Sequence, residues 1–220
     1  MPEVDSYKDC IIPAKRTGST IPAEYADEKK LRAQPVILIL GGPGTGRNTQ
    51  CEKIVTKYGF THLCIGDLLR VEATYCTPRG RQIRDTMQKG DNVSLDIVME
   101  LLRNNMLAKL DTAKGFLIDG FPRDVAQAEE FEKLVGLPKV VIMYECSPET
   151  MVARLLIRGQ TSHRFDDNEE TIKKRMDGYF KLKESIVNYY QNKKLLRKIL
   201  GEESREDVFL KTCAVLDSLE

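Results

Sequence analysis

The chain has 220 residues, a length suited to one ordinary domain with at most a small appended segment. Hydrophobic residues make up 41% of it and charged residues 30%, so it can bury a core of ordinary size. The net charge of +1 lacks the basic excess of a dedicated nucleic-acid binder. We therefore expect a globular domain whose partners do not include nucleic acid.

The apolar runs and the cysteines predict a cytoplasmic protein. The longest apolar run, Val36 to Leu40, is far shorter than the roughly 20 residues that cross a bilayer, which argues against a membrane protein. No N-terminal apolar run has the character of a secretion signal. The six cysteines contain no CxxC pair, so they are interpreted as free thiols in a reducing cytosol.

The first 33 residues predict a flexible extension. Residues 1–33 mix acidic and basic side chains with prolines and show neither a helical nor a strand period. Residues 34–220 are expected to form the folded domain. The extension is a candidate docking element for a protein partner.

Short apolar runs alternate with helical patterns along the rest of the chain, which predicts a parallel sheet flanked by helices. The run after Pro35 has the length and branching of a strand buried on both faces. Strands are predicted at 36–40, 115–119, 139–144 and 195–200. Helices are predicted over 95–110, from 124 to 135 and from 148 onward, capped by Ser94, Asp124 and Ser147.

A glycine-rich loop follows the first predicted strand. In Gly41 to Thr49, four glycines let the backbone approach a polyphosphate, and a helix starting at about Arg47 directs its positive end to the same point. The plainer alternative is a glycine-rich turn. The strict pattern GxxxxGK[ST] is not met, because Arg47 takes the lysine position and Asn48 the Ser/Thr position.

Two further polar clusters contain candidate ligands. Asp119 ends the second predicted strand and precedes Arg123, so the carboxylate could hold a Mg²⁺-bound water while the arginine faces an anion. Arg70 lies in the first turns of a helix that starts near Gly66. Taken alone, Asp119 could cap a turn and Arg70 could be a solvated surface residue.

The stretch from Arg154 to Arg175 indicates the reaction class. Two helical patterns are joined by a polar loop, and four arginines would converge if that loop folds over a site: Arg154, Arg158, Arg164 and Arg175. Planar guanidinium groups suit phosphoryl oxygens. The alternative is a charged surface loop in which nearby acids neutralise the arginines, namely Asp166, Asp167, Glu169 and Glu170.

Together these motifs resemble the short-lid adenylate kinases of the isoenzyme 1 type. GGPGTGRNTQ, THLCIGDLLR, KGFLIDGFPR and RLLIRGQTSHRFDDNEETIKKR recur in family order, and the resemblance covers about residues 34–218. It implies a P-loop NTPase-type α/β fold with a helical segment for the nucleoside monophosphate (NMP) at about 65–94 and a lid at about 159–169. It also implies a monomer that transfers a phosphoryl group from ATP to AMP with Mg²⁺, giving two ADP.

The resemblance assigns roles to individual residues. The ATP side would comprise Gly42, Pro43, Gly44, Thr45, Gly46, Arg47, Asn48, Thr49 and Arg154. The AMP side would comprise Ile65, Arg70, Val93, Gly120, Arg123, Gln127, Arg164 and Arg175. The catalytic set would be Arg47, Arg123, Arg158, Arg164 and Arg175, with Asp119 binding the metal through water. Gln127 would read adenine, because an amide can donate to N1 and accept from the 6-amino group.

Several residues depart from the family pattern and leave two functions open. The departures are Arg47, Asn48, Ile65, His163 and Glu203. The first function is an AMP-preferring kinase with slow turnover, which the retained arginines favour. The second is a catalytically impaired nucleotide-binding sensor or scaffold of the same fold, which the altered phosphate loop favours.

Overall fold

A computed structural model describes residues 23–162 and 164–219, so residues 1–22 and His163 lie outside the described part of the chain. The described strands form one parallel sheet in the order β2-β3-β1-β4-β5. They are β1 Val36–Gly41, β2 Thr61–Cys64, β3 Phe116–Asp119, β4 Val140–Glu145 and β5 Leu196–Leu200. The strand that precedes the glycine-rich loop is central in the sheet, as its apolar run predicts.

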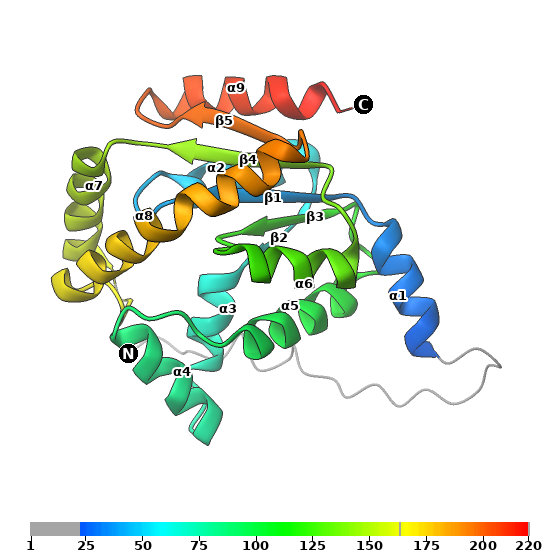
Figure 1. The fold of residues 1–220 in the computed structure, drawn as a ribbon, viewed down its shortest axis with the longest axis horizontal. Helices are drawn as coiled ribbons and strands as arrows, with labels where there is room; N and C mark the ends of the chain where they lie inside the picture. The colour runs from blue at the N-terminus through cyan, green and yellow to red at the C-terminus, as the bar shows by residue number, and fades with distance from the viewer. Residues whose placement is uncertain (1–22, 163, 220) are drawn as a thin grey trace.

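Helices cover both faces of the sheet (Figure 1). They are α1 Ala23–Ala33, α2 Arg47–Tyr58, α3 Ile65–Glu72, α4 Pro78–Gln88, α5 Leu95–Lys109, α6 Val125–Val135, α7 Pro148–Thr161, α8 Glu169–Asn192 and α9 Arg205–Asp217. None of the described helices is both long enough and apolar enough to cross a bilayer.

The alternation of side chains along β1 builds a core on each face. Leu38 and Leu40 pack with residues of α5, α6 and α8, whereas Ile37 and Ile39 pack with residues of α2 and α9. Every residue of β1 up to Leu40 is buried. This two-sided burial is the physical reason for a fully apolar strand.

The strand β2 and the helix α1 were not predicted. The strand β2 has four residues, lies at the edge of the sheet and buries only Leu63, so it carries little apolar signal. The prediction of a flexible extension is wrong for residues 23–33, because these residues form α1 and Leu31 is fully buried in the core.

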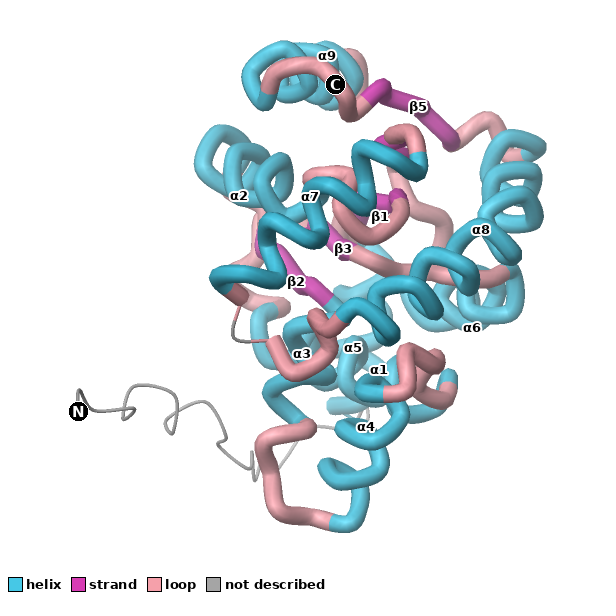
Figure 2. Tube along the Cα trace, turned by 90° about the vertical axis from the view of Figure 1, so that its left-hand side faces the viewer, coloured by secondary structure: helices cyan, strands magenta, loops and turns pink. Residues whose placement is uncertain are grey.

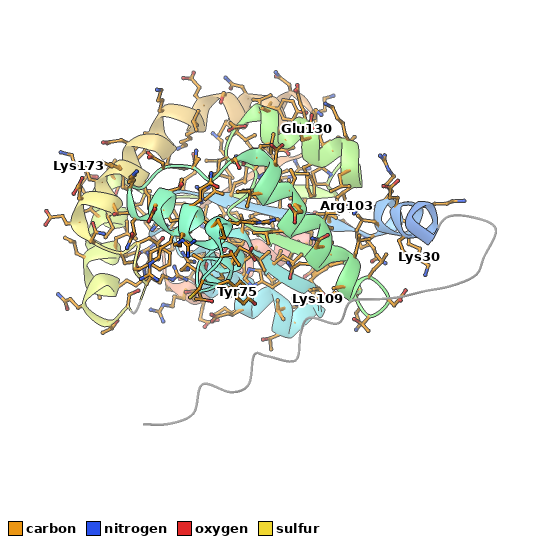
Figure 3. The ribbon with its side chains drawn as sticks, turned by 90° about the horizontal axis from the view of Figure 1, so that it is seen from below. Lys30, Tyr75, Arg103, Lys109, Glu130 and Lys173 are labelled. Carbon is orange, nitrogen blue, oxygen red and sulfur yellow. The ribbon has the colours of Figure 1, made fainter. Side chains whose placement is uncertain are left out.

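Polar contacts also hold α1 against the domain. Arg103 of α5 lies 3.6 Å from Glu28, and Lys30 lies 3.2 Å from Asp111. In Figure 3, α1 with Lys30 lies beside the end of the domain where α5 carries Arg103. The folded domain therefore begins before residue 34.

Two of the three predicted helix caps form the expected hydrogen bond. The Asp124 carboxylate accepts from the Gln127 N–H at 2.8 Å, and the Ser147 hydroxyl accepts from the Thr150 N–H at 3.2 Å. Ser94 takes the capping position of α5 without a side-chain hydrogen bond to it. The helices after β3 and β4 thus start where the sequence indicates.

Candidate active site

A cavity of about 580 Å³ opens at the carboxyl ends of the strands. In Figure 2, α7 lies in front of the strands. The lining of the cavity includes Arg154 and Arg158 of α7 and Arg175 of α8. Most predicted site residues line it: Gly42, Pro43, Gly44, Thr45, Gly46, Arg47, Asn48, Thr49, Arg70, Val93, Asp119, Gly120, Arg123, Arg154, Arg158, Arg164 and Arg175. Glu203 lines it too, whereas Ile65 and Gln127 do not.

The glycine-rich loop connects β1 to α2 and forms one wall of the cavity. Gly44 has a φ of +82°, and a Cβ there would lie 2.6 Å from the Met151 carbonyl oxygen. A side chain is therefore excluded by both backbone conformation and space. The Thr45 hydroxyl closes the loop by donating to the Gly42 carbonyl at 2.9 Å. This geometry suits close approach of phosphate oxygens to the backbone.

Arg47 is tied to Asp119 across the cavity floor. Its Nε donates to Asp119 Oδ1 at 2.6 Å, and its Nη1 donates to the Gly41 carbonyl and, at 2.8 Å, to the Gly42 carbonyl. Burial favours loss of the guanidinium proton, but the Asp119 carboxylate outweighs burial and raises the pKa of Arg47. The guanidinium thus neutralises the carboxylate that the sequence assigns to the magnesium shell.

Asp166 holds two of the predicted phosphate-binding arginines. Its Oδ2 lies 3.2 Å from Arg70 Nη1 and 3.1 Å from Arg175 Nη1. The carboxylate is almost fully buried. Arg70 comes from α3 and Arg175 from α8, so this acid links these two helices at the cavity.

A second acid, Asp167, binds Arg158 through both oxygens, at 2.6 and 2.9 Å. Burial disfavours the charged carboxylate, but hydrogen bonds from Arg158 and Ser162 prevail and lower the pKa of Asp167. Asp67 in turn lies 2.6 Å from Arg70 and 3.3 Å from Arg164. The arginines converge on the cavity, as the sequence predicts. Asp166 and Asp167 also pair with them, which is what the alternative of a charge-neutralised loop predicts for these two acids.

Arg123 has no ion-pair partner among the described residues, unlike the cavity arginines Arg47, Arg70, Arg158, Arg164 and Arg175. Its Nη1 donates to Asn92 Oδ1 at 2.5 Å. By its exposed surface Arg123 counts as an exposed residue. Protein atoms nevertheless crowd around its guanidinium group and remove water from it. Loss of hydration there, together with repulsion from Arg175, Arg47 and Arg70, lowers the pKa of Arg123 to about 10. The group stays charged at neutral pH, and its uncompensated charge favours an anion.

Arg154 and Glu203 also line the cavity. Arg154 Nη1 donates to the Gly201 carbonyl at 2.9 Å, which fixes α7 against the loop between β5 and α9. The Glu203 carboxylate lies 2.5 Å from Lys211 Nζ. Glu203 therefore brings a negative charge to the cavity wall, partly offset by this lysine.

Gln127 and Ile65 lie behind the cavity wall. Gln127 is buried, and its Oε1 accepts a hydrogen bond from the Arg123 N–H at 2.9 Å. Ile65 is the first residue of α3 and packs in the core. The adenine-reading role of Gln127 stays a prediction, and its side-chain carbonyl already has one partner.

Some residues of the site carry no signal in the sequence. Gln50 and Arg205 line the cavity, and Gln50 Nε2 donates to the Arg205 carbonyl at 3.0 Å. Gln50 lies in a helix and Arg205 begins another, so neither stands at a strand end or beside a glycine where a sequence pattern would single it out.

Known proteins resemble this chain over most of its length. The adenylate kinase family model matches residues 39–195. Adenylate kinase isoenzyme 1 of Sus scrofa is 50% identical over 193 residues, which cover 88% of this chain and all of that protein, and the Homo sapiens isoenzyme 1 is 49% identical over the same length. Adenylate kinase isoenzyme 5 of Mus musculus is 48% identical over 86% of this chain and 34% of its own length. The chain therefore belongs to the adenylate kinase family.

Proposed function

We propose that this protein transfers the γ-phosphoryl group of ATP to AMP and releases two ADP. The observation that carries the proposal is that arginines from α3, the β3–α6 loop, α7, α8 and the α7–α8 loop all line the cavity beside the glycine-rich loop. They are Arg70, Arg123, Arg154, Arg158, Arg164 and Arg175. Such a density of guanidinium groups suits two polyphosphate chains bound end to end.

The donor nucleotide would bind along the glycine-rich loop. Its phosphates would lie against Gly42 to Thr49 and the start of α2, where backbone N–H groups and the helix dipole favour anions. The base would extend toward Arg154 and Glu203. A carboxylate there favours a base that presents hydrogen-bond donors, as the 6-amino group of adenine does.

The acceptor would bind on the side of α3 and α6. Arg123 has no acidic partner among the described residues and would take the AMP phosphate first. Arg70 is held by Asp166, so the arriving dianion would replace that carboxylate as its partner. Gln127 would lie near the adenine edge after a small opening of the wall between α3 and α6.

The transfer step needs positioning and charge stabilisation rather than a protein base. An AMP phosphate oxygen attacks the γ-phosphorus, and the bond from that phosphorus to the β–γ bridging oxygen breaks, which leaves ADP on each side. The acceptor is already largely ionised at neutral pH, since its second pKa is about 6. Arg158, Arg164 and Arg175 would stabilise the charge that develops on the equatorial oxygens.

The donor set around Asp119 fits a magnesium ion held through water. The carboxylate is fully buried, lines the cavity and ends β3 at the sheet edge where the phosphates would lie. When bound with ATP, the ion would supply charge neutralisation of the phosphates. Asp119 Oδ1 can accept from a metal-bound water only after Arg47 has moved from the carboxylate to the nucleotide.

The segment between α7 and α8 would serve as the lid. The proposed lid, about 159–169, carries Arg164 and includes Asp166 and Asp167, whose ion pairs reach α3 and α8. Closing over the phosphates would exclude water and so prevent ATP hydrolysis. The protein would act as a monomer, because one chain supplies all the proposed ligands.

A second candidate function is a nucleotide-binding sensor or scaffold. The pair between Arg47 and Asp119 favours it, because this pair occupies both the loop cation and the proposed metal carboxylate. An assay of ADP formation from ATP and AMP, coupled to NADH oxidation, distinguishes the two functions. The kinase proposal requires turnover that depends on AMP and is lost in Arg158→Ala. ATP and AMP binding without turnover would favour the sensor.

A further inference from the structure

A second group of metal-ligating side chains lies near Asp119 Oδ2, the carboxylate oxygen that Arg47 does not bind. Cys51 of α2, His62 of β2 and Asp119 of β3 each offer one ligand atom, and these atoms all lie within 4.8 Å of one another. Cys51 and His62 do not line the nucleotide cavity. The nucleotide site therefore does not account for this cluster.

The sheet register and the helical period place the three residues together. His62 pairs with Leu117 and Cys64 with Asp119, so His62 and Asp119 point to the same face of the sheet, the face that α2 covers. Cys51 follows Arg47 by four positions, so both lie on the side of α2 that faces Asp119. Arg47 donates to Oδ1 of Asp119. The other oxygen, Oδ2, lies near Cys51 and His62.

Two atoms of the cluster have no hydrogen-bond partner in the described structure: Asp119 Oδ2 and His62 Nε2. They lie 4.0 Å apart, and Asp119 is fully buried. A buried acceptor left without a partner is costly, which points to a missing ligand between these atoms.

We propose that Cys51, His62 and Asp119 bind one Zn²⁺ ion. A thiolate, an imidazole and a carboxylate match the borderline-soft character of zinc, whereas Mg²⁺ prefers oxygen ligands alone. Three protein ligands leave the fourth tetrahedral position for water. Cys51 would release its proton to solvent on binding, because the thiolate is the ligand.

The geometry is close to that of a bound site and needs a small contraction. With Zn–N and Zn–S bonds of about 2.0 and 2.3 Å, ligand atoms in a tetrahedral site are roughly 3.3–3.6 Å apart. The ligands therefore have to approach one another by about 1 Å, given bonds of this length. His62 can provide much of this movement, because it lies on the edge strand and its side chain is 23% exposed.

Two of the three ligands would carry a negative charge, the thiolate of Cys51 and the carboxylate of Asp119. The carboxylate is shared with Arg47, which binds its other oxygen. These charges offset part of the desolvation penalty of a buried ion. The proposal does not depend on phosphoryl transfer, since no nucleotide takes part.

The test uses the full-length protein, free of nucleotide and magnesium, titrated with Zn²⁺ against a chromophoric chelator. We expect one equivalent of tightly bound zinc. Loss of an outer-shell partner of a metal site costs about 10- to 100-fold in affinity. Cys51→Ala and His62→Asn each remove a direct ligand, so each should weaken zinc binding by more than this. Cys213→Ala, a buried cysteine outside the cluster, and Cys76→Ser, an exposed one, should bind zinc as the parent does.

Co²⁺ in place of zinc gives a second readout, because a cobalt–thiolate bond produces a charge-transfer absorption band. The band should be present in the parent and in His62→Asn at saturating Co²⁺, and absent in Cys51→Ala. If Cys51→Ala does not fold, as judged by circular dichroism, His62→Asn decides the result through the zinc titration. The proposal is overturned if no zinc binds, if His62→Asn binds as tightly as the parent, or if a control cysteine proves necessary. In those cases ordered water is the simpler partner for the two atoms.

Discussion

Arg47 Nε lies 2.6 Å from Asp119 Oδ1, so the cation of the phosphate loop and the carboxylate proposed for the magnesium shell bind each other. The same guanidinium donates to the carbonyls of Gly41 and Gly42. These contacts hold the Arg47 guanidinium against the ends of β1 and β3. The pair links the altered loop sequence to the expected turnover, and it underlies the first prediction.

Arg47→Lys combined with Asn48→Gly should raise the rate of phosphoryl transfer. One preorganised contact to a transition state is worth about 10²- to 10³-fold in rate, and a lysine can place a point charge at the phosphates where the planar guanidinium cannot. Steady-state kinetics with ATP and AMP provide the measurement. Asn48→Gly alone is the matched control and should gain much less. An unchanged rate in an active double variant would mean that the parent already accommodates arginine.

Arg123→Ala should weaken AMP binding and leave ATP binding almost unchanged. Arg123 has no acidic partner among the described residues, so its charge is available to the acceptor phosphate. A charge-assisted hydrogen bond of about 1.5–3 kcal/mol corresponds to roughly 10- to 150-fold in affinity. Calorimetric titration with each nucleotide separately tests this. Arg79→Ala is the control, since Arg79 pairs with Glu72 and Glu100 outside the cavity. A selective loss of ATP binding would reverse the two assigned sites.

Gln127→Ala should reduce the preference for AMP over CMP. The amide would read the adenine edge, and its Oε1 also holds the Arg123 N–H. Loss of a buried polar contact costs about 1–3 kcal/mol, and we expect the ratio of kcat/KM values for AMP and CMP to fall accordingly. Glu129→Ala, an exposed change on the same helix, should leave the ratio unchanged. Equal use of AMP and CMP by the unmodified protein would refute the substrate assignment itself.

Asp166→Asn should make the free protein less stable. It should also increase the rise in Tm that AMP binding causes. The substitution leaves Arg70 and Arg175 without their shared carboxylate, at an expected cost of about 1–3 kcal/mol in the free energy of unfolding. The AMP phosphate then supplies the missing charge without having to displace Asp166. Thermal unfolding with and without AMP measures both effects. Asp111→Asn removes a surface pair with Lys30 and serves as the control. Equal AMP-induced shifts in Tm would show that Asp166 does not compete with the nucleotide.

Leu31→Ala tests whether α1 belongs to the folded domain. Leu31 is fully buried in the core shared with α5 and α6, so its truncation should lower the free energy of unfolding by about 2–5 kcal/mol. Urea unfolding followed by circular dichroism gives this value. Lys29→Ala, an exposed change in the same helix, should cost well under 1 kcal/mol. A neutral Leu31→Ala would place α1 outside the cooperative unit.

The sequence by itself determined the parts of this protein that have a strong local signal. The apolar run of β1 predicts a strand buried on both faces. The glycines after it predict a tight turn, and in the structure a side chain at Gly44 would clash with Met151. The caps at Asp124 and Ser147 mark the helix starts, because a side-chain acceptor satisfies a free N–H within three residues. The family motifs also contain the glycine-rich loop and most of the arginines that line the cavity.

Only the tertiary structure decided which side chains pair across those elements. The sequence shows acids near arginines, but Asp166 meets Arg70 over 96 positions of chain, and no local pattern encodes that contact. The same holds for Arg47 and Asp119, which lie 72 positions apart, and for the cluster of Cys51, His62 and Asp119. The physical reason is range: periodicity and capping act within a few residues, whereas ion pairs and metal sites depend on the sheet register and helix packing that fold distant segments together.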